Sequence, residues 1–118
     1  GVTAVLDWEF SGRGDPQADL GWLCAKCWRF GSAHPVGGIG PREALYSGYE
    51  EESGKSVDDA RVRWWEIGAH IRWASIAIDQ AQRHISGIEN SLELALTGHI
   101  VPELEWEILN AVEARDHA

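Results

Sequence analysis

The chain opens on a short apolar run and then changes to helical periodicity. Residues 2–6 are Val-Thr-Ala-Val-Leu, a β-branched and apolar stretch of the kind that forms a buried strand. A loop that contains two glycines follows at residues 11–14, and Asp15 with Pro16 supplies a helix start. The pattern therefore predicts a mainly α fold in which one short β-strand leads into a helical bundle.

Apolar residues at helical spacing, with capping residues and glycine stops, indicate five helices in the rest of the chain. Pro41 opens the second helix and Asp58 or Asp59 opens the third, while Gly31 and Gly54 supply C-terminal stops. The predicted helices cover residues 15–31, 41–54, 59–85, 91–97 and 102–115.

The longest predicted helix, residues 59–85, carries apolar side chains on two separate faces. A helix of this kind is sandwiched between neighbours, so we expect it at the centre of the bundle. Two polar stripes separate the faces, and they include His70 and Arg72. The two apolar faces consist of Trp64, Ile67, Ile71, Ala74 and Ile78, and of Val62, Trp65, Ala69, Trp73 and Ile76.

Composition limits the classes of function. The length of 118 residues corresponds to one domain, and 19 acidic against 10 basic residues give a formal charge of −9. This balance argues against non-specific binding to nucleic acid or to an anionic membrane. No apolar run approaches the roughly 20 residues needed to span a bilayer, and two cysteines form no disulfide framework, so we expect a cytoplasmic protein. The absence of Met and the abrupt strand-like opening suggest a piece of a larger protein.

Asp7 is the first candidate for chemistry. It ends the apolar run and stands beside the glycine loop, where a carboxylate can be held at the edge of a cleft. Hard oxygen ligands suit Mg²⁺, which takes one or two carboxylates together with substrate phosphates. Spacing alone leaves a second interpretation open, in which Asp7 only caps a turn.

The stretch from residue 5 to residue 23 resembles the C-terminal half of the aminoglycoside phosphotransferase family, relatives of choline kinases and protein kinases. The elements that carry the resemblance are Asp7-Trp8-Glu9, Gly14-Asp15-Pro16, Asp19 and Leu20. Later positions are similar to a subgroup related to the kinase-like modules of acyl-CoA dehydrogenase fusion proteins, among them Trp28-Arg29-Phe30-Gly31, Tyr49-Glu50, Trp64-Trp65-Glu66 and Arg72-Trp73.

This resemblance implies the helical C-terminal subdomain of a protein-kinase-like fold and an activity that depends on ATP and Mg²⁺. Asp7 matches the magnesium-binding Asp of the family, which holds the metal on the phosphates of ATP. Trp8 matches the packing aromatic that follows this Asp. Glu9 either assists the metal or pairs with Arg13.

Two further acidic residues match the family pattern. The resemblance implies that Asp15 and Asp19 anchor the loop and brace the catalytic segment, and we assign them a structural role. Residues 1–14 would then be the strand and metal-binding loop from the end of the catalytic core, and residues 15–118 the helical subdomain.

The resemblance also indicates which parts of the family pattern the chain does not contain. The catalytic loop, His-Gly-Asp with an Asn five residues after the Asp, is expected upstream of Gly1, and the nucleotide-binding lobe lies further upstream. We therefore expect no catalytic base in this chain and no activity from the chain alone. Its N-terminal strand, without its natural partners, would fray or pair with a second copy.

The remaining candidates have simpler explanations beside the functional ones. Cys24 and Cys27 form a lone Cys-x-x-Cys pair, which is too few ligands for zinc and lacks the strand of a redox motif, so core packing is expected. His70, Arg72 and Trp73 lie together on the longest helix. They either satisfy internal contacts or touch the acceptor, because the family's acceptor pocket is floored by the helical subdomain.

The sequence thus favours part of an ATP- and Mg²⁺-dependent phosphotransferase that acts on a hydroxyl of a small molecule. The rival interpretation is a free-standing helical binding or interaction module without catalytic activity. The residues encoded before Gly1 separate the two, because only the enzyme requires the His-Gly-Asp loop there.

Overall fold

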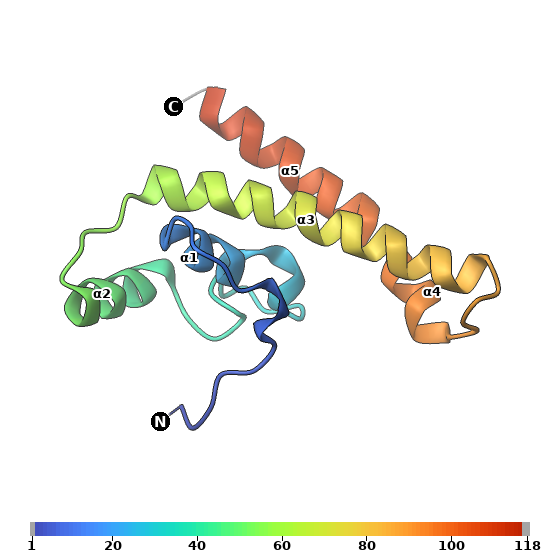
Figure 1. Ribbon diagram of the computed structural model, residues 1–118. Helices are drawn as coiled ribbons and strands as arrows, with labels where there is room; N and C mark the ends of the chain where they lie inside the picture. The colour runs from blue at the N-terminus through green and yellow to red at the C-terminus, as the bar shows by residue number, and fades with distance from the viewer. Residues whose placement is uncertain (1, 117–118) are drawn as a thin grey trace.

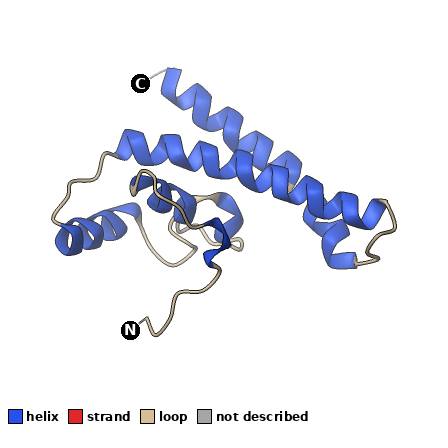
Figure 2. Ribbon diagram, in the orientation of Figure 1, coloured by secondary structure: helices blue, strands red, loops and turns tan. Residues whose placement is uncertain are grey.

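The computed structural model describes residues 2–116, without the side chains of Glu9, Arg115 and Asp116. In this part of the chain, five α-helices and two short 3-10 turns make up the fold (Figure 1). The mainly α class predicted from the sequence is confirmed, and Figure 2 shows helices joined by loops. The elements are η1 Trp8–Phe10, α1 Gln17–Cys24, η2 Lys26–Trp28, α2 Arg42–Ser53, α3 Asp59–Ile85, α4 Leu92–Gly98 and α5 Val101–Asp116.

Helix α3 is the centre of the fold, as its two apolar faces predict. Helices α1, α4 and α5 all pack against it (Figure 1). Two contacts are close enough to require small residues: a Cβ on Gly21 of α1 would lie 2.7 Å from the Cβ of Trp65, and one on Gly98 of α4 would lie 2.6 Å from the Cβ of Ala81. These approaches bring the flanking helices directly onto the α3 surface.

The two apolar faces of α3 are not covered equally. Val62 and Ala69 of one face are buried, whereas Ile71 and Ile78 of the other are more than half exposed. Helix α5 diverges from α3 towards its own C-terminus (Figure 1). The expectation that both faces are fully covered is therefore wrong in these residues.

Local capping signals fix the helix ends as the sequence predicts. The Asp58 carboxylate accepts a hydrogen bond from the backbone N–H of Arg61 at 3.2 Å, and α3 begins at the next residue, Asp59. The Ser91 hydroxyl caps α4 in the same manner through the N–H of Leu94. Helix α2 ends at Gly54, which has a left-handed φ of 67° that a glycine adopts without strain.

The strand predicted for residues 2–6 is not formed. These residues have no regular secondary structure and their side chains are exposed, and β structure in residues 2–116 is limited to one isolated bridge between Val36 and Gly40. A β-strand needs a hydrogen-bonded neighbour, and the described chain offers none beside residues 2–6. The described residues therefore contain no strand edge for the predicted pairing with a second copy.

The first helix is shorter than predicted, because it ends at Cys24 and not near Gly31. Ala25 leaves the helix with ψ of 146°, and the chain continues as η2. Long-range hydrogen bonds replace helical ones at this break: the N–H of Lys26 donates to Nε2 of His70, and Arg29 donates to the carbonyl of Cys24. The break places Cys24 and Cys27 on different elements, both as free thiols.

Candidate functional site

Asp7 stands at the start of η1 in a left-handed conformation, with φ of 62° and ψ of 56°. Aspartate and asparagine tolerate this region better than most residues. The carboxylate is exposed and makes no capping hydrogen bond to the turn that follows. Asp7 therefore does not serve as a turn cap here, and its oxygens are available to a ligand.

Trp8 closes the turn that carries Asp7. Its indole Nε1 donates to the carbonyl oxygen of Val5 at 3.0 Å, across three residues, and its ring is largely exposed. The backbone N–H of Ser11 donates to the carbonyl of Trp8 and completes η1. The predicted role of Glu9 falls on a side chain that lies outside the described residues.

Asp15 joins the loop after η1 to the helical body. Its carboxylate accepts hydrogen bonds from the indole Nε1 of Trp65 at 2.7 Å and from the backbone N–H of Gln17 at 3.0 Å, and it forms an ion pair with Arg61. The Trp65 hydrogen bond is the main cause that lowers the pKa of Asp15 below its usual value. Asp19 is exposed in the first turn of α1, where its negative charge interacts favourably with the helix dipole.

The aromatic residues between α1, η2 and α3 form a three-membered tryptophan cluster. Trp22 and Trp28 have ring centroids 5.8 Å apart, and Trp28 and Trp73 are 5.3 Å apart in tilted geometry. The guanidinium of Arg72 lies over Phe10 at 4.5 Å and over Trp22 at 5.7 Å. Arg72 thus faces η1 and α1, while Trp73 faces η2.

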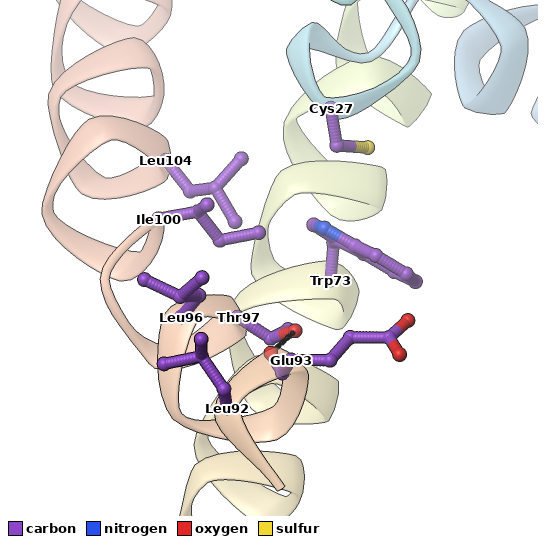
Figure 3. Close-up of a pocket in the computed structure, with 8 residues that line it drawn as sticks. All are labelled: Cys27, Trp73, Leu92, Glu93, Leu96, Thr97, Ile100 and Leu104. Atoms are coloured by element: carbon purple, nitrogen blue, oxygen red, sulfur yellow. Dashed lines mark hydrogen bonds between the residues drawn. The ribbon is translucent and has the colours of Figure 1, made fainter.

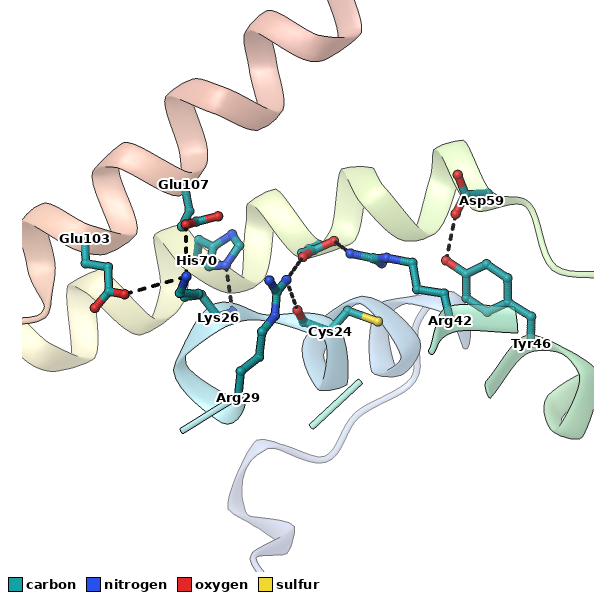
Figure 4. Close-up of polar contacts among 10 residues, drawn as sticks. Cys24, Lys26, Arg29, Arg42, Tyr46, Asp59, His70, Glu103 and Glu107 are labelled. Atoms are coloured by element: carbon teal, nitrogen blue, oxygen red, sulfur yellow. Dashed lines mark hydrogen bonds and ion pairs between the residues drawn. The ribbon is translucent and has the colours of Figure 1, made fainter. Parts of the chain in front are cut away.

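His70 is 2% exposed and takes part in an internal contact. Its Nε2 accepts the backbone N–H of Lys26 at 2.9 Å, which holds the start of η2 on α3 (Figure 4). The Lys26 ammonium in turn lies 3.8 Å from Glu103 and 3.5 Å from Glu107 of α5. Burial lowers the pKa of His70, more than nearby Glu66 and Glu107 raise it, so the imidazole is neutral at pH 7.

Glu66 forms the most buried ion-pair network of the described chain. Its two carboxylate oxygens accept from Arg29 at 2.9 Å and from Arg42 at 2.6 Å, and all three side chains are largely buried. The network ties α3 to the end of η2 and to the start of α2. A hydrogen bond from the Tyr46 hydroxyl to the Asp59 carboxylate, 2.9 Å long, also joins α2 to α3 (Figure 4). The sequence did not indicate this network, because no spacing rule links residues 29, 42 and 66.

A groove of about 550 Å³ opens between η2, α3, α4 and the start of α5 (Figure 3). Most of its lining is aliphatic or aromatic, and Trp73 contributes from α3 an indole N–H that is buried without a hydrogen-bond partner in the described chain. Burial raises the pKa of Cys27 to about 11, so its thiol is neutral at pH 7 and is a poor nucleophile. The lining residues are Cys27, Trp73, Leu92, Glu93, Leu96, Thr97, Ile100 and Leu104.

The predicted site residues fall in two places. Asp7 and Trp8 are on η1, which contacts Arg72, whereas Trp73 belongs to the groove on the side of α4 and α5.

No cluster of three or more His, Cys, Asp or Glu residues that could hold a metal occurs among the described residues. Within the same residues, no helix is long and apolar enough to cross a membrane.

The buried His70 makes stability depend on pH. As the pH falls below about 6.5, the unfolded chain binds a proton at this residue more readily than the folded protein does, so unfolding becomes easier. We expect the urea midpoint to fall between pH 7 and pH 5.5, and this fall to be smaller in His70→Gln, whose amide oxygen can accept the Lys26 N–H. His34→Gln, which changes an exposed histidine, is the matched control. An equal fall in all three proteins would contradict a buried neutral His70.

These observations define a helical protein with an exposed carboxylate on a short turn that is fastened to a central helix. The model of the phosphotransferase enzyme family matches residues 1–65, which is more than half of the chain. The chain therefore belongs to this family, whose members are ATP-dependent phosphotransferases that use Mg²⁺. No curated protein and no solved structure matched the chain.

Proposed function

We propose that this chain is the helical part of an enzyme that transfers the γ-phosphoryl group of ATP to a hydroxyl of a small molecule, with Asp7 binding the Mg²⁺ that accompanies ATP. The observation that carries the proposal is the exposed, uncapped carboxylate of Asp7 within the residues that match the family. In this proposal, residues 1–14 supply the metal-binding loop and residues 15–118 the helical subdomain. The base and the nucleotide lobe belong to chain that precedes Gly1, so the 118 residues alone would not transfer phosphate.

The carboxylate of Asp7 is the kind of ligand that Mg²⁺ prefers. Asp7 offers a hard anionic oxygen with no partner to displace in the described chain, and Mg²⁺ commonly takes one or two carboxylates and completes its shell with water and phosphates. Asp7 would hold the metal, which would supply positive charge beside the phosphates of ATP and offset the negative charge that develops during transfer. Glu9 is a second candidate ligand in this proposal.

The other family residues keep this carboxylate in place. Trp8 closes the turn through its hydrogen bond to Val5, and Asp15 fastens the following loop to Trp65 of α3. Positioning of this kind matters because phosphoryl transfer depends mainly on alignment and electrostatics. Asp19 supports the first turn of α1 beside that loop.

For the acceptor we propose the groove beside Trp73. Its apolar walls favour an acceptor with an apolar portion, and Trp73 contributes an aromatic side chain to these walls. His70 acts here by holding η2, which carries Cys27 of the groove wall. The resemblance to the kinase-like modules of acyl-CoA dehydrogenase fusion proteins, taken from the sequence, points equally to hydroxylated acyl compounds and to sugars.

A charge placed on the groove wall tests the acceptor site. In the full-length protein, Leu96→Asp should raise the Michaelis constant of the acceptor by about tenfold, because it removes an apolar contact and adds a charge, and should leave that of ATP unchanged. Leu109→Asp on α5 is the control, since this leucine is equally exposed and lies outside the groove. The acceptor is found by screening hydroxyl compounds for ATP turnover. Equal Michaelis constants in both variants would remove the groove from the active site.

The rival function, a helical binding module, makes a different prediction for the full-length protein. It requires no His-Gly-Asp loop before Gly1 and no magnesium-dependent binding of ATP. Titration calorimetry with ATP in the presence and absence of Mg²⁺ decides between the two. ATP binding that is absent, or that ignores Mg²⁺, would favour the binding module.

A further inference from the structure

Arg72 makes an unusual contact for a charged residue on a central helix. Its guanidinium lies 4.5 Å from the ring centroid of Phe10, the last residue of η1, and 5.7 Å from that of Trp22 on α1. No hydrogen bond or ion pair joins Arg72 to another residue in the described part of the chain. Its interactions are therefore with aromatic faces, which attract a cation through the ring quadrupole.

The contact with Phe10 also joins η1 to α3 of the helical body. The hydrogen bonds of residues 5–11 in the described chain are all local: Trp8 donates to Val5 and Ser11 donates to Trp8. The first polar contact from this end of the chain to α3 comes later, at Asp15. Phe10 is 57% exposed, so burial of its ring does little to fix the turn.

We propose that Arg72 is a positioning residue. Its cation–π contact with the ring of Phe10 holds η1, and with it the Asp7 carboxylate, in a fixed orientation on α3. The inference rests on the proposed role of Asp7. Phe10 and Asp7 stand at opposite ends of one 3-10 turn, so fixing the ring limits rotation of the whole turn. Arg72 does not touch the metal or the acceptor in this role.

The chemistry of the two side chains makes the contact specific. A guanidinium is planar and weakly hydrated, and it stacks on aromatic faces better than the compact, strongly hydrated ammonium of lysine. Leucine approximates the volume of phenylalanine but has no π face, whereas tyrosine keeps the ring. Arg72→Gln and Phe10→Leu therefore remove the attraction. Arg72→Lys keeps part of it, and Phe10→Tyr keeps most of it.

The test uses the full-length protein and two readouts that do not depend on turnover. The first is the affinity for Mn²⁺, a paramagnetic substitute for Mg²⁺, measured by electron paramagnetic resonance with a non-hydrolysable ATP analogue present. The second is hydrogen exchange of the Ser11 amide, which reports on η1. Arg72→Gln and Phe10→Leu should each weaken Mn²⁺ binding and speed this exchange by about two- to fivefold, which is the range for an exposed cation–π pair.

The control variants and the double variant show whether the effects come from the contact between Arg72 and Phe10. Phe10→Tyr should behave like the wild type, Arg72→Lys should be intermediate, and the double variant Phe10→Leu/Arg72→Gln should be no worse than either single variant, because both remove one interaction. Additive effects, or unchanged Mn²⁺ affinity and exchange in Arg72→Gln, would overturn the proposal. A rise confined to the acceptor's Michaelis constant would instead assign Arg72 to acceptor binding.

The Asp7→Asn variant separates the metal-binding role of Asp7 from the positioning role of Arg72. If Asp7→Asn leaves Mn²⁺ affinity unchanged, Asp7 is not a metal ligand, and the hydrogen exchange of Ser11 alone then decides whether Arg72 holds η1. If Asp7→Asn abolishes Mn²⁺ binding while the Arg72 and Phe10 variants have no effect, the metal site stands and the positioning role is wrong.

Discussion

Replacing Asp7 by asparagine in the full-length protein is expected to lower the rate of phosphoryl transfer at least about a hundredfold, the loss typical of removing one group that stabilises the charge of a transition state. The expected fold is unchanged, because asparagine has nearly the same shape and tolerates the left-handed conformation of residue 7. Asp7 makes no capping hydrogen bond that the amide would lose. The measurement is ATP turnover per folded molecule, with the melting temperature recorded in parallel.

Asp79→Asn is the matched control for this variant. Asp79 lies exposed on α3 and undergoes the same chemical change, so its turnover should stay at the wild-type value. A melting temperature many degrees lower in Asp7→Asn, with turnover per folded molecule unchanged, would show that Asp7 has a purely structural role.

Removing the charge of Glu66 should have the largest effect on stability. Glu66→Gln leaves the guanidinium groups of Arg29 and Arg42 close together without their shared carboxylate in a largely buried position. Breaking a buried ion pair from one side typically costs about 3–5 kcal/mol, and we expect a loss of this order in the free energy of unfolding by urea.

Glu89→Gln makes the same chemical change in the ion pair with Arg83, where both partners are about half exposed. An exposed pair contributes at most about 1 kcal/mol, so this control should unfold close to the wild type. Equal losses in the two variants would mean that the Glu66 network does not hold η2 and α2 on α3.

The elements that the sequence predicted well are those with local signals. Helix α3 has the predicted bounds because Asp58 caps its first turn and an uninterrupted helical pattern continues from there. Gly54 ends α2 because a left-handed residue stops a helix wherever it occurs. These effects depend on neighbouring residues and can be read from one chain.

The elements that were predicted wrongly depend on distant residues. Residues 2–6 have the composition of a strand, but a strand needs a partner that composition cannot supply. The first helix breaks at Ala25 because His70, far away in sequence, accepts the next backbone N–H. Helical spacing contains no information on that contact.

The candidate site shows the same division. Family motifs indicated Asp7, Trp8 and Asp15, because the residue types and their spacing are distinctive. The contact between Arg72 and Phe10 and the groove beside Trp73 arise from the packing of separate elements, so no motif indicated them.

The Mn²⁺ affinity of the full-length protein in the presence of a non-hydrolysable ATP analogue shows whether Asp7 binds the metal that accompanies ATP. Electron paramagnetic resonance counts free Mn²⁺ in titrations of the wild type, Asp7→Asn and Asp79→Asn. We predict that the wild type and Asp79→Asn bind equally, and that Asp7→Asn binds at least about tenfold more weakly because one anionic ligand is lost. Equal affinity in all three proteins would show that Asp7 is not a ligand of the metal.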